Sequence, residues 1–214
     1  MVTTVVSLRL LLLGATGAVG REVLAQALAD SRVGEVVAPT RRSLPEHERL
    51  HNPVTDFTQL DAAAPWWQAD AVVCALGTTI KVAGSQAAFA AVDRDLVIDT
   101  ARLARQAGAT RLALNSSLGA SAQGNFYLRT KAQAEEGVRA LGYPSLTIVR
   151  PSLIAAEREA VRPGEVTGLW VARVLGPLIP RRYRPVAAAR IASALLEAAL
   201  QGAPGAHIIE SGRL

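Results

Sequence analysis

Cysteine and lysine are both scarce in this sequence, which limits the chemistry that it can carry. The single cysteine, Cys74, cannot form an internal disulfide, and its apolar neighbours predict a buried thiol rather than a reactive one. Only two of the 23 basic residues are lysines, Lys81 and Lys131, so a lysine beside other reactive groups is informative. The three histidines are scattered without the spacing of metal ligands, and we expect no metal site.

The sequence also lacks a long apolar run. Residues 10–13 form the longest, with Val5, Val6 and Leu8 before it, but Arg9 interrupts it and it is far too short to span a bilayer. The run has neither the basic leader nor the small-residue cleavage site of a secretory signal. We therefore expect a cytoplasmic protein with no membrane partner.

The overall composition is that of a globular chain. Half of the 214 residues are hydrophobic and 19% are charged, which is enough apolar surface for one buried core. We expect a single domain over residues 1–214, in which the Pro- and Arg-richer residues 151–185 contribute a small substrate cap. The net charge is +5, but the arginines are spread along the chain and no nucleic-acid module is recognisable. We expect no nucleic-acid partner, since a phosphorylated small ligand explains part of the excess charge.

Strand-like apolar runs alternate with helical segments along the chain. Continuous apolar strands between helices are typical of a parallel sheet that is covered on both faces. The sequence therefore predicts an α/β fold with a doubly wound parallel sheet. The predicted strands are Leu8 to Leu13, Val33 to Ala38, Ala71 to Leu76, Arg111 to Asn115, Ser145 to Val149 and Ala206 to Ile209. One predicted crossover helix follows the first strand, and another runs from an N-cap at Ser85 to Gln106, with Gly108 just past its end.

A glycine-rich turn follows the first predicted strand directly. It has the spacing Gly14-x-x-Gly17-x-x-Gly20, and a helix begins within it. In that context the glycines allow a tight turn, a close approach of the backbone to a pyrophosphate, and close packing of helix on strand. The N-terminus of the helix offers free N–H groups to the phosphates. The turn predicts a bound dinucleotide and a Rossmann-type fold.

Two arginines mark the end of the second strand. Sites specific for NAD usually place an acidic residue here, to bind the ribose 2′-hydroxyl, but this sequence has Arg41 and Arg42. Their guanidiniums are suited to fork-like contacts with a 2′-phosphate, which predicts NADP(H) as the cofactor. The alternative is that both are solvated loop residues of an Arg-rich protein.

A tyrosine and a lysine stand four residues apart at the start of a predicted helix. This spacing puts Tyr127 and Lys131 side by side on one helical face. A nearby cation favours the phenolate, so the tyrosine can exchange a proton near neutral pH. Just before them, the fourth predicted sheet strand ends in Asn115-Ser116-Ser117, where a hydroxyl can hold a substrate carbonyl. Spacing does not decide between the two serines, and we favour Ser117.

The sequence resembles the short-chain dehydrogenase/reductase superfamily, in its atypical branch with Gly-x-x-Gly-x-x-Gly, and within that branch the Tat-interactive-protein-like oxidoreductases. The resemblance covers roughly residues 8 to 200. It is carried by Leu76-Gly77-Thr78-Thr79, Ala83-Gly84, Val92-Asp93-Arg94-Asp95, Ser116-Ser117-x-Gly119-Ala120, Asn125-Phe126 and Arg150-Pro151, together with Glu159-x-x-Arg162-Pro163-Gly164-Glu165. The NADP contacts that it implies are Thr16, Gly17, Ala18, Val19, Arg41, Arg42, Leu76, Gly77, Tyr127, Lys131, Ile154 and Arg162.

The sequence departs from related sugar-nucleotide epimerases after Arg150, where too few residues follow for a large substrate lobe. We expect instead a small C-terminal cap, with helices over Thr167 to Leu175 and Ala187 to Leu200. The leading hypothesis is an NADP(H)-dependent oxidoreductase that acts on an unidentified small carbonyl or alcohol substrate. Its catalytic residues would be Tyr127, Lys131 and Ser117. The alternatives are a non-catalytic NADP(H)-binding regulator with a protein partner and, third, an epimerase-like enzyme.

Overall fold

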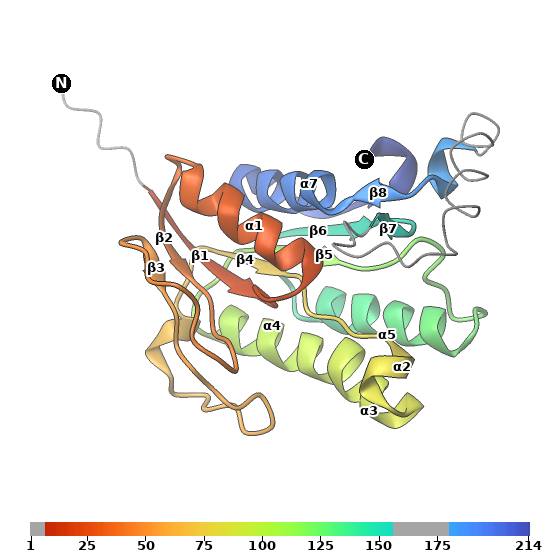
Figure 1. Cartoon of the computed structure of the whole chain (residues 1–214), viewed down its shortest axis with the longest axis horizontal. Helices are drawn as coiled ribbons and strands as arrows, with labels where there is room; N and C mark the ends of the chain where they lie inside the picture. Colours follow the sequence, from red (N-terminus) through yellow and green to blue (C-terminus); the bar gives the residue numbers. More distant parts are fainter. Residues whose placement is uncertain (1–6, 156–179) are drawn as a thin grey trace, which may run out of the picture.

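A seven-stranded, wholly parallel sheet runs through the centre of the computed structural model (Figure 1), which describes residues 7–155 and 180–214. The strand order is β3-β2-β1-β4-β5-β6-β9, which confirms the predicted doubly wound sheet. Its strands are β1 (Leu8–Leu13), β2 (Val33–Val37), β3 (Leu50–His51), β4 (Ala71–Cys74), β5 (Arg111–Asn115), β6 (Ser145–Arg150) and β9 (Gly205–Glu210). Only β3 was not predicted, because two residues are too few to show a periodic pattern.

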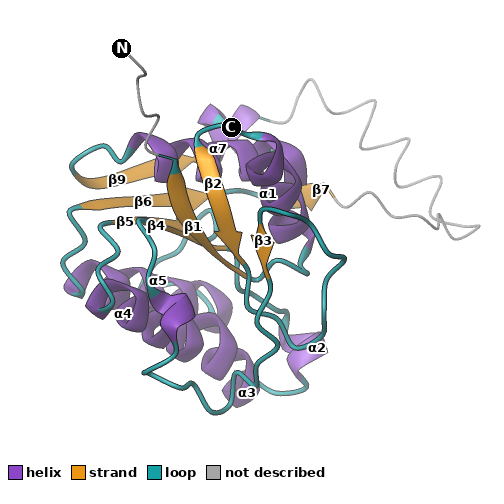
Figure 2. Ribbon diagram, turned by 90° about the vertical axis from the view of Figure 1, so that its left-hand side faces the viewer, coloured by secondary structure: helices purple, strands orange, loops and turns teal. Residues whose placement is uncertain are grey.

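Helices cover both faces of the sheet, as Figures 1 and 2 show. One face carries α1 (Ala18–Ala29) and α7 (Ala188–Gln201), and the other carries α4 (Val97–Gln106) and α5 (Phe126–Ala140). Successive residues of β1 explain the two cores, because side chains alternate across a strand. Leu10 and Leu12 are buried beneath α1 and α7, whereas Leu11 and Leu13 are buried in the opposite core. None of the helices in residues 7–155 and 180–214 is long and apolar enough to cross a membrane.

The predicted helix from Ser85 to Gln106 forms as three consecutive segments. These are α3 (Gln86–Ala90), a π-helical segment (Ala91–Leu96) and α4. Ser85 is the predicted N-cap, since its hydroxyl accepts the N–H of Ala88 at 3.1 Å, and Gly108 follows the end with φ of +109°. The π-helical segment was not predicted. It turns Asp93 and Val97 inward, so that both are buried while Leu96 is only half-buried. Such segments are frequent at functional sites.

The cap expected over residues 151–185 stays a prediction, because most of it lies outside the described residues. The described part of the C-terminal region includes a small parallel pair, β7 (Ile154–Ala155) with β8 (Val186–Ala187), while the predicted helix over 167–175 lies outside the described residues. The helix predicted over 187–200 forms as α7, but it covers the sheet instead of capping a site. Ile191 and Leu195 are fully buried against α1 and the sheet, because the apolar stripe of α7 is wide enough to complete that core. Shorter segments are α2 (Ile80–Ala83) and the 3₁₀ turns Pro65–Trp67, Arg181–Tyr183 and Ser211–Arg213.

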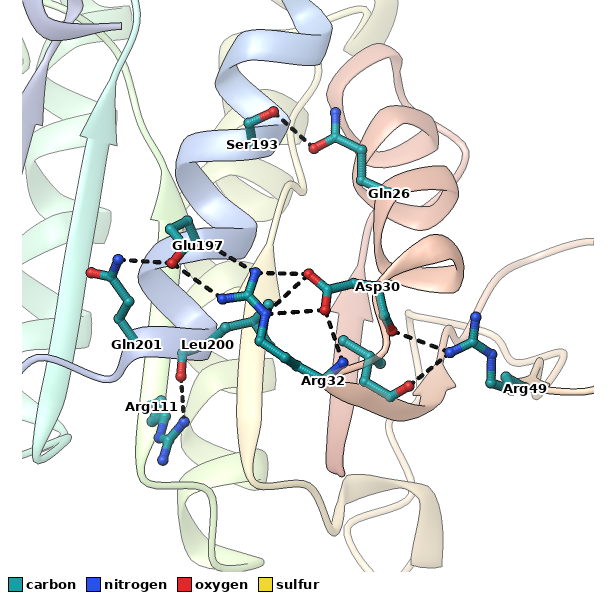
Figure 3. Close-up of polar contacts among 10 residues, drawn as sticks. Gln26, Asp30, Arg32, Arg49, Arg111, Ser193, Glu197, Leu200 and Gln201 are labelled. Carbon is teal, nitrogen blue, oxygen red and sulfur yellow. Dashed lines mark hydrogen bonds and ion pairs between the residues drawn. The ribbon is translucent and has the colours of Figure 1, made fainter. Parts of the chain in front are cut away.

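A polar clamp fixes α7 beside α1 (Figure 3). Arg32, just after α1, donates to both oxygens of Asp30 and also to Glu197 of α7 at 2.8 Å. Further along the same helices, the Ser193 hydroxyl donates to the side-chain oxygen of Gln26 at 2.9 Å. These contacts set the position of α1, the helix that begins in the glycine-rich turn.

Candidate active site

The predicted site residues follow the carboxyl ends of neighbouring strands, which lie at one edge of a parallel sheet. The chain leaves β1 for β2 on one side, and β4 lies on the other side of β1. This reversal of strand order is the point at which open α/β sheets bind ligands. The loops after the two strands lie against each other there, since a Cβ added to Gly14 would approach the backbone of Ala75 to 2.7 Å.

The glycine-rich turn is built as the motif requires. Gly14 has φ of +87°, which favours glycine, and a Cβ on Gly20 would lie 1.9 Å from the carbonyl oxygen of Gly14. These two glycines are therefore needed for the turn and for the packing of α1 on it. Gly17 differs, because a Cβ there would meet only the Gly14 oxygen at 3.4 Å. Its lack of a side chain leaves the backbone open to a ligand.

The first turn of α1 begins at the same edge. Gly17 is the N-cap, the first residues of the turn include no acid, and within residues 7–155 and 180–214 no side-chain oxygen accepts from its N–H groups. Uncapped N–H groups and the positive end of the helix dipole suit a pyrophosphate, so the turn fits a dinucleotide. Thr16, Gly17 and Ala18 are exposed. The Val19 side chain is buried in the core, so only its backbone is available to a cofactor.

Arg41 and Arg42 are exposed in the turn that follows β2. Their neighbour Thr40 is 4% exposed and anchors the turn, so the two guanidiniums extend from a fixed base. Within the described part of the chain, neither forms an ion pair with an acidic side chain. Both charges are therefore available to an anion at this end of the sheet.

Lys131 is buried and paired with an acid that sequence reasoning did not assign to the site. Its Nζ lies 2.7 Å from Oδ1 of Asp93, and the two side chains are 8% and 1% exposed. The second oxygen of Asp93 accepts the N–H of Thr78 at 2.8 Å. A Cβ on Gly77 would lie 3.7 Å from the lysine nitrogen, so Lys131 is held beside the bare backbone after β4.

Tyr127 lies one turn before Lys131 in α5, on the same face of the helix. Its side chain is half-buried, and its ring packs against Phe89, with 5.4 Å between the ring centroids. Phe89 is fully buried, which restricts the tyrosine ring. Asn125 caps α5 by accepting the N–H of Leu128 at 3.0 Å, so the helix begins just before the tyrosine, as predicted.

The two serines after β5 have different surroundings. The Ser116 hydroxyl is buried and donates to Oε1 of Glu135 at 2.6 Å. Ser117 is half-buried, and among the described residues its hydroxyl has only a long contact of 3.5 Å with the carbonyl of Leu118. Of the two hydroxyls, that of Ser117 is therefore the more available to a substrate.

Glu135 is the centre of a buried polar network that joins α5 to the ends of β5 and β6. It is 1% exposed and accepts from Ser116 and from two nitrogens of Arg150, with Nε at 2.9 Å. The hydrogen bond to Glu135 raises the pKa of Arg150. Arg150 also reaches Glu210 of β9 at 3.2 Å. The signal in the sequence is spacing, because Tyr127, Lys131 and Glu135 succeed one another at intervals of four residues.

The remaining predicted residues have simpler positions. Leu76 is half-buried against the core below β4, and Ile154 is 39% exposed in β7. Arg162 lies outside the described residues. Burial raises the pKa of the Cys74 thiol to about 11, as expected of a core cysteine. No group of three potential metal ligands occurs in the described ranges.

The parallel sheet, the glycine-rich turn and the strand-order reversal together define a Rossmann-type nicotinamide-dinucleotide-binding protein. The model of the NAD(P)H-binding family matches residues 14–200, and the chain belongs to this family. It is 37% identical over 168 residues to Protein HTATIP2 of Rattus norvegicus, covering 76% of this chain and 67% of that protein. It is 36% identical over 176 residues to Protein fmp52, mitochondrial, of Emericella nidulans, covering 77% of this chain and 75% of that protein.

Solved structures confirm the fold. The Bordetella bronchiseptica enzyme WbmG in complex with NAD aligns with a TM-score of 0.69 over 99% of this chain and 75% of that one, at 18% identity. A putative NAD-dependent epimerase/dehydratase from Bacillus halodurans aligns with a TM-score of 0.66 over 96% of this chain and 94% of that one, at 21% identity. The chain thus shares its fold with these two solved structures.

Proposed function

We propose that this protein is an NADP(H)-dependent oxidoreductase that interconverts a small carbonyl compound and its alcohol. The observation that carries the proposal is that Tyr127 shares a face of α5 with Lys131, which is buried and held beside Gly77 by Asp93. A lysine whose nitrogen is 2.7 Å from a 1% exposed aspartate is a fixed charge. Such a charge beside a tyrosine suits proton exchange with a substrate oxygen.

Each residue has a separate task in the proposed reaction. Tyr127 gives a proton from its phenolic oxygen to the substrate oxygen in reduction, and takes it back in oxidation. Lys131 stabilises the phenolate left on the tyrosine, while Asp93 holds the lysine in position. Ser117 donates a hydrogen bond that orients the substrate carbonyl. A nicotinamide held by the glycine-rich turn would supply or accept the hydride.

The test of catalysis is consumption of NADPH with a panel of aldehydes, ketones and quinones, followed by its absorbance. Replacement of Tyr127 by Phe should lower kcat by about 100-fold or more, because general acid catalysis is lost, with the Kd for NADPH nearly unchanged. Tyr143→Phe is the matched control, since it removes a buried hydroxyl that donates to the carbonyl of Ala101 at 2.6 Å, and it should stay active. Turnover that survives Tyr127→Phe would contradict the mechanism.

The choice of cofactor rests on Arg41 and Arg42. Replacing both by Ala should weaken NADPH binding by about 100-fold or more, since charge-assisted hydrogen bonds contribute about 1.5–3 kcal/mol each, and should change NADH binding little. Arg102→Ala, at an exposed position of α4, is the control for loss of an arginine. An equal loss for both cofactors would refute the 2′-phosphate assignment.

The non-catalytic NADP(H)-binding regulator is the alternative that the same experiments separate. Tight NADPH binding without turnover of any panel member, in wild type as in Tyr127→Phe, would favour the regulator and a protein partner. The cytoplasmic location remains a prediction, and the fmp52 relatives are named mitochondrial. Microscopy of the tagged chain in its own cells would test it.

A further inference from the structure

The side chain of Asn52 forms hydrogen bonds on both sides of the turn that carries Arg41 and Arg42. Asn52 follows β3 directly, and its Nδ2 donates to the carbonyl of Ala38 at 2.5 Å and to the hydroxyl of Thr40 at 2.8 Å. Its Oδ1 accepts the N–H of Leu44 at 2.7 Å. These partners stand on both sides of the arginine pair, so one amide uses both of its donors and its acceptor to close the turn.

Thr40 completes the anchorage from within the turn. Its hydroxyl accepts from Asn52 and donates to the carbonyl of Arg42 at 2.6 Å. Its backbone N–H donates to the carbonyl of Pro53 at 3.0 Å, and its carbonyl accepts the N–H of Thr55 at 2.9 Å. Asn52 and Thr40 together therefore fix the backbone at both arginines, although the arginine side chains themselves are exposed.

Side-chain hydrogen bonds hold this turn at the margin of the core, where Leu44 packs. The neighbouring strand β3 has only two residues, so the regular ladder that could fix the turn is short. On its other side the turn borders an open hollow of about 620 Å³, lined by Ser43 to Glu48, Leu50 and Asn52. Because Asn52 is only half-buried and borders this hollow, removal of its amide should loosen the turn more than it disturbs the core.

We propose that Asn52, acting with Thr40, is a positioning residue that sets the preference for a 2′-phosphorylated dinucleotide. An arginine loses side-chain entropy when it binds an anion, and a fixed backbone lowers the number of conformations that must be lost. Two guanidiniums on one fixed turn can bind the same phosphate. The inference rests on the proposed binding of NADP(H), and it predicts that Asn52 affects NADPH but not NADH, because the two differ only in that phosphate.

The experiment measures the Kd of NADPH and of NADH by isothermal titration calorimetry on the full chain. Asn52→Ala should raise the Kd of NADPH by about tenfold, which corresponds to loss of about one hydrogen bond's contribution, and should leave the Kd of NADH within about twofold. Gln59→Ala, at an exposed position of the same connection between β3 and β4, should change neither. In the variant with Ala at both Arg41 and Arg42, adding Asn52→Ala should not change the Kd of NADPH further.

The outcomes separate this inference from the cofactor assignment on which it rests. If the double arginine variant keeps the NADPH preference, the assignment itself is wrong. If that variant loses the preference but Asn52→Ala keeps it, or if Asn52→Ala weakens both cofactors equally, the positioning role is overturned. Should Asn52→Ala fail to fold, Thr40→Val serves instead, because it keeps the shape of the buried side chain and removes the hydroxyl that reaches Arg42. It should raise the Kd of NADPH by about threefold or more.

Discussion

The ammonium group of Lys131 lies 2.7 Å from the carboxylate of Asp93, and both side chains are buried. This ion pair joins α5 to the π-helical segment that precedes α4, next to the bare backbone of Gly77. Because a buried charge is costly without its partner, each residue fixes the other, and the lysine is in place before any ligand arrives.

The pair can be tested by a double-mutant cycle on stability. Asp93→Asn and Lys131→Met should each lower the free energy of unfolding by about 3 kcal/mol, since each leaves one buried charge uncompensated. The double variant should lose about 1–3 kcal/mol less than the sum. Lys81→Met, at the other, exposed lysine, should cost within about 0.5 kcal/mol. Additive losses in urea unfolding would show that the two groups do not interact.

Two glycines of the turn should respond differently to alanine. Gly20→Ala puts a Cβ 1.9 Å from the Gly14 oxygen, so it should lower stability by about 2 kcal/mol or more. Gly17 has φ of −76° and room for a methyl group, so Gly17→Ala should lower the free energy of unfolding by no more than about 1 kcal/mol. The same variant should weaken NADPH binding by about tenfold or more, because the methyl group blocks the approach of the phosphates. Thermal melts and calorimetric titrations measure the two effects, and unchanged binding in Gly17→Ala would contradict the phosphate site.

The buried network around Glu135 provides a matched pair of neighbouring variants. Glu135→Gln leaves the guanidinium of Arg150 without its buried counter-charge and should lower the free energy of unfolding by about 3 kcal/mol. Glu136→Gln removes the same charge from an exposed position of α5 and should change it within about 0.5 kcal/mol. Denaturant unfolding of both variants at pH 7 makes the comparison, and similar values for the two would mean that the network adds nothing to stability.

The polar clamp around Arg32 makes the free energy of unfolding depend on pH. Its hydrogen bonds lower the pKa of Asp30 below the ordinary 3.8 and that of Glu197 below the ordinary 4.5. A carboxylate with a lowered folded pKa stabilises the fold above its unfolded pKa, and the contribution is lost as pH falls through the folded value. Glu197→Gln should therefore be less stable than wild type at pH 7, with a smaller difference near pH 3. The exposed Glu48→Gln serves as control, and a constant difference would contradict the linkage.

The sequence predicted the parts of the molecule that follow from local patterns. Continuous apolar runs predicted β1 to within a residue, and the spacing of Tyr127 and Lys131 predicted their shared helical face. The partners of these residues could not be predicted in the same way. Asp93 reaches Lys131 only because a π-helical segment precedes α4, and Asn52 reaches the arginine turn across strands whose pairing depends on the whole sheet.

The choice between the serines shows the same limit. Ser116 and Ser117 are neighbours of one residue type, and only the buried carboxylate of Glu135, 19 residues later, distinguishes them. The helix over 187–200 is a further case. Its apolar stripe predicted the helix, but the face of the sheet that the helix covers depends on where α1 leaves room.

The contact between Arg32 and Glu197 spans 165 positions of the chain. Contacts between residues so far apart form late, because the intervening chain must first be ordered, and they slow folding. Until residues 188–201 have been synthesised and have docked, the face of β4, β5 and β6 that α7 covers, with Val73 and Ala113, stays open to water beside α1. The nascent chain therefore presents an apolar surface to chaperones and to other unfinished chains, on strands that begin beside β1 and its dinucleotide turn.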